Sequence, residues 1–264
     1  MRLLTGRIAA LLLSLALIFP AASFGKEKVT LRADLWCPYT CEPRSDKPGY
    51  LIEIAREIFG AQGIEVDYRL MPWKRVLVSL RAGEIDGAVG AGQHEIPGTI
   101  APARSLGADV TVLAVPKDLP FVFDGAASLG QLRIGVVTDY SFDDGGDIDA
   151  YVRRHIAAKD GKIEQVYGAD AQMQNMEKLL NGRIDGIMDD QQVLRFNMTR
   201  LSSPLPLRFI VIDARMDSSI AFSPANPRAQ AYADMLSDGI DALRRSGRLQ
   251  QILHRYGLSD WEKN

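Results

Sequence analysis

The stretch MPWKRVLVSLRAGEIDGAVGAG, residues 71–92, holds the pattern that decides the fold. Its first half predicts a short helix, because Val76, Leu77 and Leu80 share one helical face. Gly83 then supplies a typical helix stop signal. Its second half, EIDGAVGAG, predicts a short buried strand that runs into glycine. A helix followed by a buried strand is typical of a mostly parallel sheet with helices on both faces.

The same alternation continues on both sides of this stretch. VTLRADL (29–35) and IEVDYRLMPW predict strands, and YLIEIAREIFGAQG between them predicts a helix. After an irregular segment at 93–108, strands are expected at 109–115, 132–137, 183–190, 207–213 and 218–224, with helices at 147–158 and 170–182. The tail predicts two helices broken near Gly247. Two α/β halves of this kind predict two lobes.

Several aromatic and polar side chains lie just after predicted strands. They are Tyr39, Trp73, Gln93, Tyr140 and the pair Asp189 and Asp190. Ligands of open α/β sheets bind beyond the carboxyl ends of the strands. We therefore expect these side chains to border a common site.

The N-terminal segment has the pattern of a secretory signal peptide. Arg2 and Arg7 precede the apolar run IAALLLSLALIF, which at about twelve residues is short for a membrane span. Small residues follow, and cleavage is expected after Gly25, with Ser23 as the other option. The predicted signal peptide is 1–25, and the expected compartment of the remaining chain is the periplasm.

Charge and histidine spacing exclude other functional classes. Removal of two arginines with the signal segment takes the formal net charge from −2 to about −4, which leaves no basic footprint for nucleic acid. None of His94, His155 and His254 has a histidine or cysteine partner at metal-ligand spacing. We expect no metal and no cofactor.

The chain's two cysteines lie together in RADLWCPYTCEP, residues 32–43. In an oxidising compartment, Cys37 and Cys41 are interpreted first as a disulfide. A zinc site would need two more ligands, and redox catalysis usually has two intervening residues rather than three. The bridge would make the turn that carries Tyr39 locally rigid.

Six segments of the chain resemble one protein family. They are PGYLIEIAREIF, MPWKRVLVSLRAGEIDGAVGA, LRIGVV, LLNGRIDGIMDD, IAFSP and LRRSGRLQQILHRYGL. In this order they are similar to the bacterial extracellular solute-binding proteins of the polar amino acid type (family three), which are periplasmic receptors of ABC importers. The similarity covers nearly all of the chain after the signal segment, although no single motif is decisive.

The resemblance implies a fold and a division of the chain. The fold is the α/β type II (Venus-flytrap) periplasmic binding protein fold, with two mixed β-sheets flanked by helices and two crossing hinge strands. Lobe one would be 26–113 plus 218–264, and lobe two 114–217. A small polar solute would bind between the lobes of a monomer, and the lobes would close on it.

The resemblance also assigns roles to particular residues. Asp190 matches a cleft aspartate that pairs a cationic or hydroxyl group, although an aspartate before QQVLRFNM also suits a helix N-cap. Tyr140 and Ser141 lie in the turn that holds an anionic end of the ligand. Trp73 would stack on a solute and Arg75 pair its acidic group; alternatively, Trp73 packs under the helix start and Arg75 faces solvent.

One segment departs from the family pattern. Members that bind α-amino acids carry a Thr-Pro-x-Arg-like run whose arginine pairs with the ligand carboxylate. Here the run is GAGQHEIPGTIAPAR, and its only arginine, Arg104, does not align with the motif. This departure puts an α-amino-acid ligand in question.

Three functions follow from the pattern. The leading hypothesis is a binding protein, not an enzyme, that delivers a small polar solute to an ABC permease in the inner membrane. One alternative is a periplasmic enzyme on the same fold, similar to the cyclic-acid dehydratases, with His94, Glu95, Asp189 and Asp190 as its candidate acids and bases. The other is a solute-binding sensor or accessory protein that serves no permease.

Overall fold

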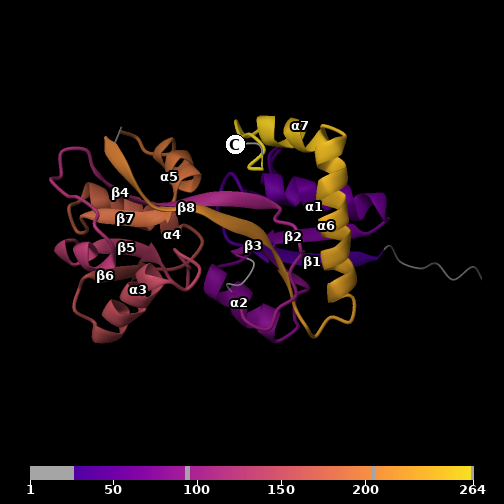
Figure 1. The fold of residues 1–264 in the computed structure, drawn as a ribbon, viewed down its shortest axis with the longest axis horizontal. Coiled ribbons are helices and arrows are strands. Elements are labelled where there is room, and N and C mark those ends of the chain that lie inside the picture. The colour runs from indigo at the N-terminus through magenta and orange to yellow at the C-terminus, as the bar shows by residue number, and fades with distance from the viewer. Residues whose placement is uncertain (1–26, 93–95, 204–205, 263–264) are drawn as a thin grey trace, which may run out of the picture.

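The computed structural model describes residues 27–92, 96–203 and 206–262. Two lobes lie side by side, and two long strands run between them (Figure 1). The predicted signal segment 1–25 and the predicted site residue Gln93 lie outside the described residues. Within the described ranges, no helix is both long and apolar enough to cross a membrane.

Lobe one contains the segment 71–92, which forms α2 (Trp73–Arg81) and β3 (Gly87–Gly92). Its elements alternate as β1 (Lys28–Ala33), α1 (Tyr50–Ala61), β2 (Glu65–Leu70), α2 and β3. β1 pairs in parallel with both β2 and β3, as the alternation predicts. Helix α1 forms because Leu51, Ile54, Ala55 and Ile58 share one buried face.

Lobe two repeats the alternation later in the chain. Its elements are the 3₁₀ helix η1 (Ala126–Gln131), β5 (Ile134–Val137), α3 (Asp147–Ala158), β6 (Ile163–Val166), α4 (Ala171–Leu180), β7 (Gly186–Asp190) and α5 (Gln191–Met198). β5 pairs in parallel with β6 and β7. The strand β6 was not predicted from the sequence, because it has only 4 residues and its edge position leaves Gln165 exposed, which weakens the apolar signal.

Two long strands link the lobes. They are β4 (Gly107–Pro116) and β8 (Leu207–Phe222), and they pair with each other in antiparallel fashion. β8 also pairs with β3, and β4 with β7, so the two sheets join in the order β2-β1-β3-β8-β4-β7-β5-β6. The sequence predicted two separate strands at 207–213 and 218–224. They form one strand of 16 residues, because β4 supplies hydrogen-bonding partners through Asp213, Met216 and Asp217.

Two helices close the chain on lobe one. They are α6 (Ala229–Arg245) and α7 (Arg248–His254), and they stand beside α1 (Figure 1). Their buried residues join the core of β1, α1 and β2, whereas β5, α3 and η1 enclose a separate core in lobe two. The division at 113/114 and 217/218 stays a prediction.

Candidate functional site

A small cavity of about 40 Å³ lies where the two lobes meet. Lobe one, lobe two and the crossing strands all contribute to its wall. The lining residues are Asp34, Trp36, Trp73, Val89, Gly90, Asp109, Tyr140, Ser141, Met216 and Asp217. The cavity has room for only a few water molecules. Hydrogen bonds from Tyr140 to Asp34 and from Trp36 to Asp189 join the lobes beside it, so the lobes are closed at this point. A larger hollow of about 710 Å³, lined by α2 and by the turn after β5, stays open between them.

The loop after β1 is closed by the disulfide between Cys37 and Cys41 that the sequence predicted. Trp36 and Thr40 also form an isolated bridge across this loop. The loop presents Trp36, rather than Tyr39, to the cavity. Tyr39 is 2% exposed and stacks on Trp36 with 4.1 Å between ring centroids, so it supports the cavity wall from behind.

Tyr39 also reaches a crossing strand. Its hydroxyl donates to the backbone oxygen of Ala108 in β4 at 3.4 Å. It lines a second, larger hollow of about 420 Å³, together with Asp190 and Trp261. Tyr39 therefore does not line the small cavity but borders this second hollow, and its hydroxyl ties the disulfide loop to β4. A role for Tyr39 in binding stays a prediction.

Asp34 and Tyr140 form a direct hydrogen bond between the lobes. Asp34 follows β1, Tyr140 follows β5, and the Tyr140 hydroxyl donates to the Asp34 carboxylate. Gln172, near the start of α4, donates to the same hydroxyl at 2.9 Å. Burial raises the pKa of Asp34 to about 6. An uncharged acid is therefore favoured in the closed arrangement as the pH falls toward that value.

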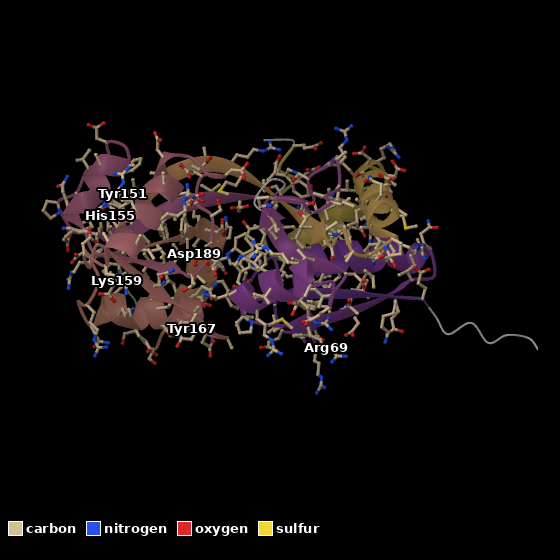
Figure 2. The ribbon with its side chains drawn as sticks, turned by 90° about the horizontal axis from the view of Figure 1, so that it is seen from below. Arg69, Tyr151, His155, Lys159, Tyr167 and Asp189 are labelled. Carbon is tan, nitrogen blue, oxygen red and sulfur yellow. A yellow bond between two sulfur atoms is a disulfide. The ribbon has the colours of Figure 1, made fainter. Side chains whose placement is uncertain are left out.

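Asp189 makes the second hydrogen bond between the lobes. The Trp36 indole N–H donates to Asp189 Oδ1 at 3.3 Å, and the Asp190 backbone N–H donates to the same oxygen at 2.8 Å. The other oxygen, Oδ2, is buried and has no hydrogen-bond partner among the described residues. Burial and the nearby carboxylates of Asp190 and Asp34 raise the pKa of Asp189 to about 8. Figure 2 shows Asp189 on the side of lobe two that faces lobe one.

The side chain of Asp190 caps the N-terminus of α5. Its Oδ1 accepts from the backbone N–H groups of Gln192 and Val193 at 2.7 and 2.9 Å, and its Oδ2 accepts from Val110 of β4 at 3.0 Å. Asp190 does not line the small cavity. These contacts support the helix-cap interpretation and move the candidate cleft carboxylate one residue back, to Asp189.

Trp73 and Arg75 lie only two residues apart, but only Trp73 lines the cavity. Trp73 lines the cavity at the start of α2, and its ring meets Tyr140 edge-on with 6.3 Å between centroids. Its indole N–H is buried without a described partner. Arg75 is exposed and does not line the cavity. The helical period of 3.6 residues places the two side chains on different faces.

In the turn that carries Ser141, hydrogen-bond donors are bound by the carboxylates of Asp143 and Asp149. Ser141 lines the cavity, but its hydroxyl donates to Asp149 at 2.6 Å. The backbone N–H groups of Phe142 and Gly145 also donate to Asp149, each at 2.8 Å. Asp143 accepts from two backbone N–H groups in the first turn of α3. The donors that would hold an anionic ligand end are therefore already paired.

A glycine completes the cavity wall. Gly90 lies at a bulge in β3 with φ 93°, a conformation that side chains other than glycine rarely adopt. A Cβ atom there would lie 3.4 Å from the Trp36 ring. That distance is an ordinary van der Waals contact, so the backbone conformation, rather than lack of space, restricts this position to glycine.

Sequence reasoning missed Asp34, Trp36 and Gln172. Asp34 and Trp36 lie near the carboxyl end of β1, where the same signal singled out Tyr39. Gln172 lies on a helix, and no sequence signal singles it out. Among the described residues, no group of three or more histidine, cysteine or acidic side chains is placed to hold a metal ion.

Comparison with known proteins shows similarity in structure but not in sequence. No family model matches the chain, and no curated protein matches it. The substrate-binding protein of an amino acid ABC transporter is 18% identical, with a TM-score of 0.65 over 87% of this chain and 98% of that one. A structure from work on glutathione import via GshT and the cystine ABC importer TcyBC of Streptococcus mutans has 17% identity, TM-score 0.69 and coverages of 91% and 100%.

A third similar structure belongs to a different functional class. It is a histidine kinase sensor domain with similarity to periplasmic binding proteins, 18% identical, with a TM-score of 0.67 over 88% of this chain and 96% of that one. Each match spans nearly the whole of the other protein, so the similarity concerns the complete two-lobed arrangement. The chain has the two-lobed α/β fold of periplasmic solute-binding proteins.

Proposed function

We propose that this protein captures a small polar solute between its lobes and delivers it to an ABC importer in the inner membrane. The observation that carries the proposal is the cavity at the junction of the lobes, whose wall comes from both lobes and from both crossing strands. The fold is shared with a substrate-binding protein of an amino acid ABC transporter, which supports the same role. Residues 1–25 direct export to the periplasm, where the chain works as a monomer.

Closure is the binding step. Lobe one (26–113 plus 218–264) and lobe two (114–217) move about β4 and β8 and enclose the solute. The closed arrangement without solute holds the Asp34–Tyr140 and Trp36–Asp189 hydrogen bonds, and contacts to the solute replace them when it binds. A solute shifts the lobes toward closure only by the difference between its affinities for the closed and open forms.

The experiment is native mass spectrometry of protein purified under mild conditions, followed by small-angle scattering of the emptied protein with the identified molecule. We expect a carried small polar molecule and a smaller radius of gyration when it is added back. Absence of any carried molecule, together with no closure on addition of a total bacterial metabolite extract, would contradict the proposal.

Substitution of a cavity aromatic gives the corresponding variant test. Trp73→Ala should weaken binding of the carried molecule roughly tenfold or more, because the ring lines the cavity. Trp73→Phe keeps the apolar packing and separates loss of binding from loss of folding. Tyr167→Ala is the matched control, because Tyr167 is 76% exposed and lies on the outer side of lobe two (Figure 2). Calorimetry with equal affinity in all variants would remove Trp73 from the site.

A receptor without a permease is the second candidate, favoured by the fold shared with a histidine kinase sensor domain. The two candidates differ in whether the loaded protein stimulates ATP hydrolysis by an importer reconstituted in vesicles. We propose that neither role includes turnover. Incubation with cyclic acids, followed by chromatography, should return them unchanged; a new product would establish an enzyme instead.

A further inference from the structure

The cavity between the lobes has acidic and aromatic walls. Asp34, Asp109 and Asp217 contribute to its lining, and none of its described lining residues is lysine, arginine or histidine. Asp109 accepts from the Ser218 hydroxyl, and Asp217 pairs with Arg215 at 3.3 Å. Among the cavity acids, Asp34 has the contact that opening of the lobes would break.

Asp189 adds an unsatisfied acceptor directly behind this wall. It is 2% exposed, holds the Trp36 ring by one oxygen, and leaves Oδ2 without a described partner. A buried carboxylate oxygen without a donor is costly, and a cation placed nearby removes that cost. Asp34 is close enough to raise the pKa of Asp189 further, so one positive charge between them would stabilise both.

Three aromatic rings surround the same space. Trp36 and Trp73 come from lobe one, and Tyr140 comes from lobe two. An organic cation within about 6 Å of such a ring face is attracted by the π electrons, and the attraction grows when water is excluded. Rings from both lobes would therefore contact a cation only in the closed arrangement.

The turn after β5 already holds two carboxylates of its own. Asp149 and Asp143 accept from the backbone N–H groups of Phe142, Gly145, Ile148 and Asp149, which a ligand carboxylate would otherwise use. Arg104 lies away from the cavity and pairs with Asp241 of α6 at 3.4 Å. A ligand carboxylate would instead meet Asp34 and Asp109 at the cavity wall.

We propose that the solute is a small organic cation without a carboxylate group, an amine or guanidine held between Asp34, Asp189 and the rings of Trp36, Trp73 and Tyr140. This inference rests on the proposed capture of a solute and names its chemical class. The cavity of about 40 Å³ must widen as the lobes adjust, because even a short amine needs more space.

The test uses two pairs of probes that differ only by the carboxylate: agmatine against arginine, and putrescine against ornithine. Emptied protein is titrated with each probe by calorimetry at low salt. We expect at least one amine to bind roughly tenfold or more tightly than its amino acid. Equal or tighter binding of arginine or ornithine overturns the proposal, because a carboxylate would then be accommodated.

Variants test the named residues. Asp34→Asn and Asp189→Asn should each weaken the bound amine roughly tenfold or more, whereas Asp118→Asn, an exposed position in the loop after β4, should leave it unchanged. Circular dichroism of each emptied variant reports separately on folding. If no amine binds while mass spectrometry finds a carried neutral or anionic solute, the cation proposal fails and the capture proposal stands.

Discussion

Two buried aspartates of lobe two, Asp149 and Asp189, differ in how their carboxylates are satisfied. Asp149 is 4% exposed and accepts three hydrogen bonds, which use both oxygens. Asp189 is 2% exposed, but both of its hydrogen bonds go to Oδ1, and Oδ2 has no partner among the described residues. The two residues are alike in type and burial and differ only in their donors.

The difference separates a structural carboxylate from a candidate functional one. Asp149 holds the turn after β5 in shape, and its loss would leave buried N–H groups unpaired. Asp189 is incompletely satisfied in the closed arrangement, and it lies where the lobes meet. Burial with an unpaired oxygen is unfavourable for folding, and such groups concentrate at functional sites.

The largest expected effect is on the free energy of unfolding of Asp149→Asn. The new amide would place an NH₂ group against the N–H of Gly145 or Phe142, and we expect a loss of about 4 kcal/mol. At about pH 4, where the cost of ionising Asp189 has not yet developed, Asp189→Asn should change stability by less than about 1 kcal/mol, because the amide oxygen can accept both existing donors. Denaturant unfolding of the solute-free proteins measures both. Equal losses of unfolding free energy in the two variants would show that Asp149 and Asp189 do not differ in structural role.

The pH dependence of stability should sharpen the comparison. The pKa of Asp189 is raised from 3.8 to about 8 and that of Asp34 from 3.8 to about 6, so each binds more protons in the folded than in the unfolded chain. Stability is therefore lost as the pH rises above 3.8 and through these values, by about 3 kcal/mol for Asp34 and about 5 kcal/mol for Asp189 at pH 8.

Asp189→Asn should flatten this profile between about pH 6 and 8, where Asp34 has already titrated. Thermal unfolding of the emptied protein across that range measures the slope, with Asp118→Asn as the exposed control. A slope unchanged by Asp189→Asn would show that the carboxylate is not buried in the solute-free protein, and hence that the lobes stand open without solute.

The smallest expected effect concerns the disulfide. Replacing Cys37 and Cys41 by serine should cost roughly 2 kcal/mol of stability, because the closed loop is short. The loss of local order should be larger near Asp189 than near Asp149, because the disulfide loop carries Trp36, which donates to Asp189. Amide hydrogen exchange should show faster exchange at Thr40, whose N–H donates to Trp36, and no change at Phe142 beside Asp149. Equal changes at both amides would mean that the bridge stabilises the whole chain.

Several features could be predicted from the sequence because they rest on local physics. The helix at 147–158 is observed as α3 over the same residues, since its apolar spacing and its flanking glycines are local signals. The disulfide follows from two cysteines four residues apart in an exported chain. The lobe-one order β1-α1-β2-α2-β3 follows from the change between the two apolar periods.

The sequence located the candidate site in the right loops and strand ends, but it did not identify which of several neighbouring residues line it. Adjacent positions such as Asp189 and Asp190 point to opposite faces of a strand, and the sequence signal at a strand end is the same for both. The choice depends on α5, whose first backbone N–H groups bind Asp190, and on Trp36 of the other lobe, which binds Asp189. Trp36, for which the sequence predicted no role, lines the cavity in place of Tyr39 for a similar reason, since the disulfide-closed turn sets which ring faces the cavity.

The sequence by itself determined the alternation of strands and helices, the two α/β halves, the cysteine bridge and the strand edge at which the candidate site lies. These features depend on apolar periodicity and on short-range spacing. Only the tertiary structure decided that 207–222 is one strand, that Asp149 fills its own turn, and that Asp34, Trp36, Tyr140 and Asp189 meet. The physical reason is that hydrogen-bond partners and register come from segments distant in the sequence, here up to 153 residues apart.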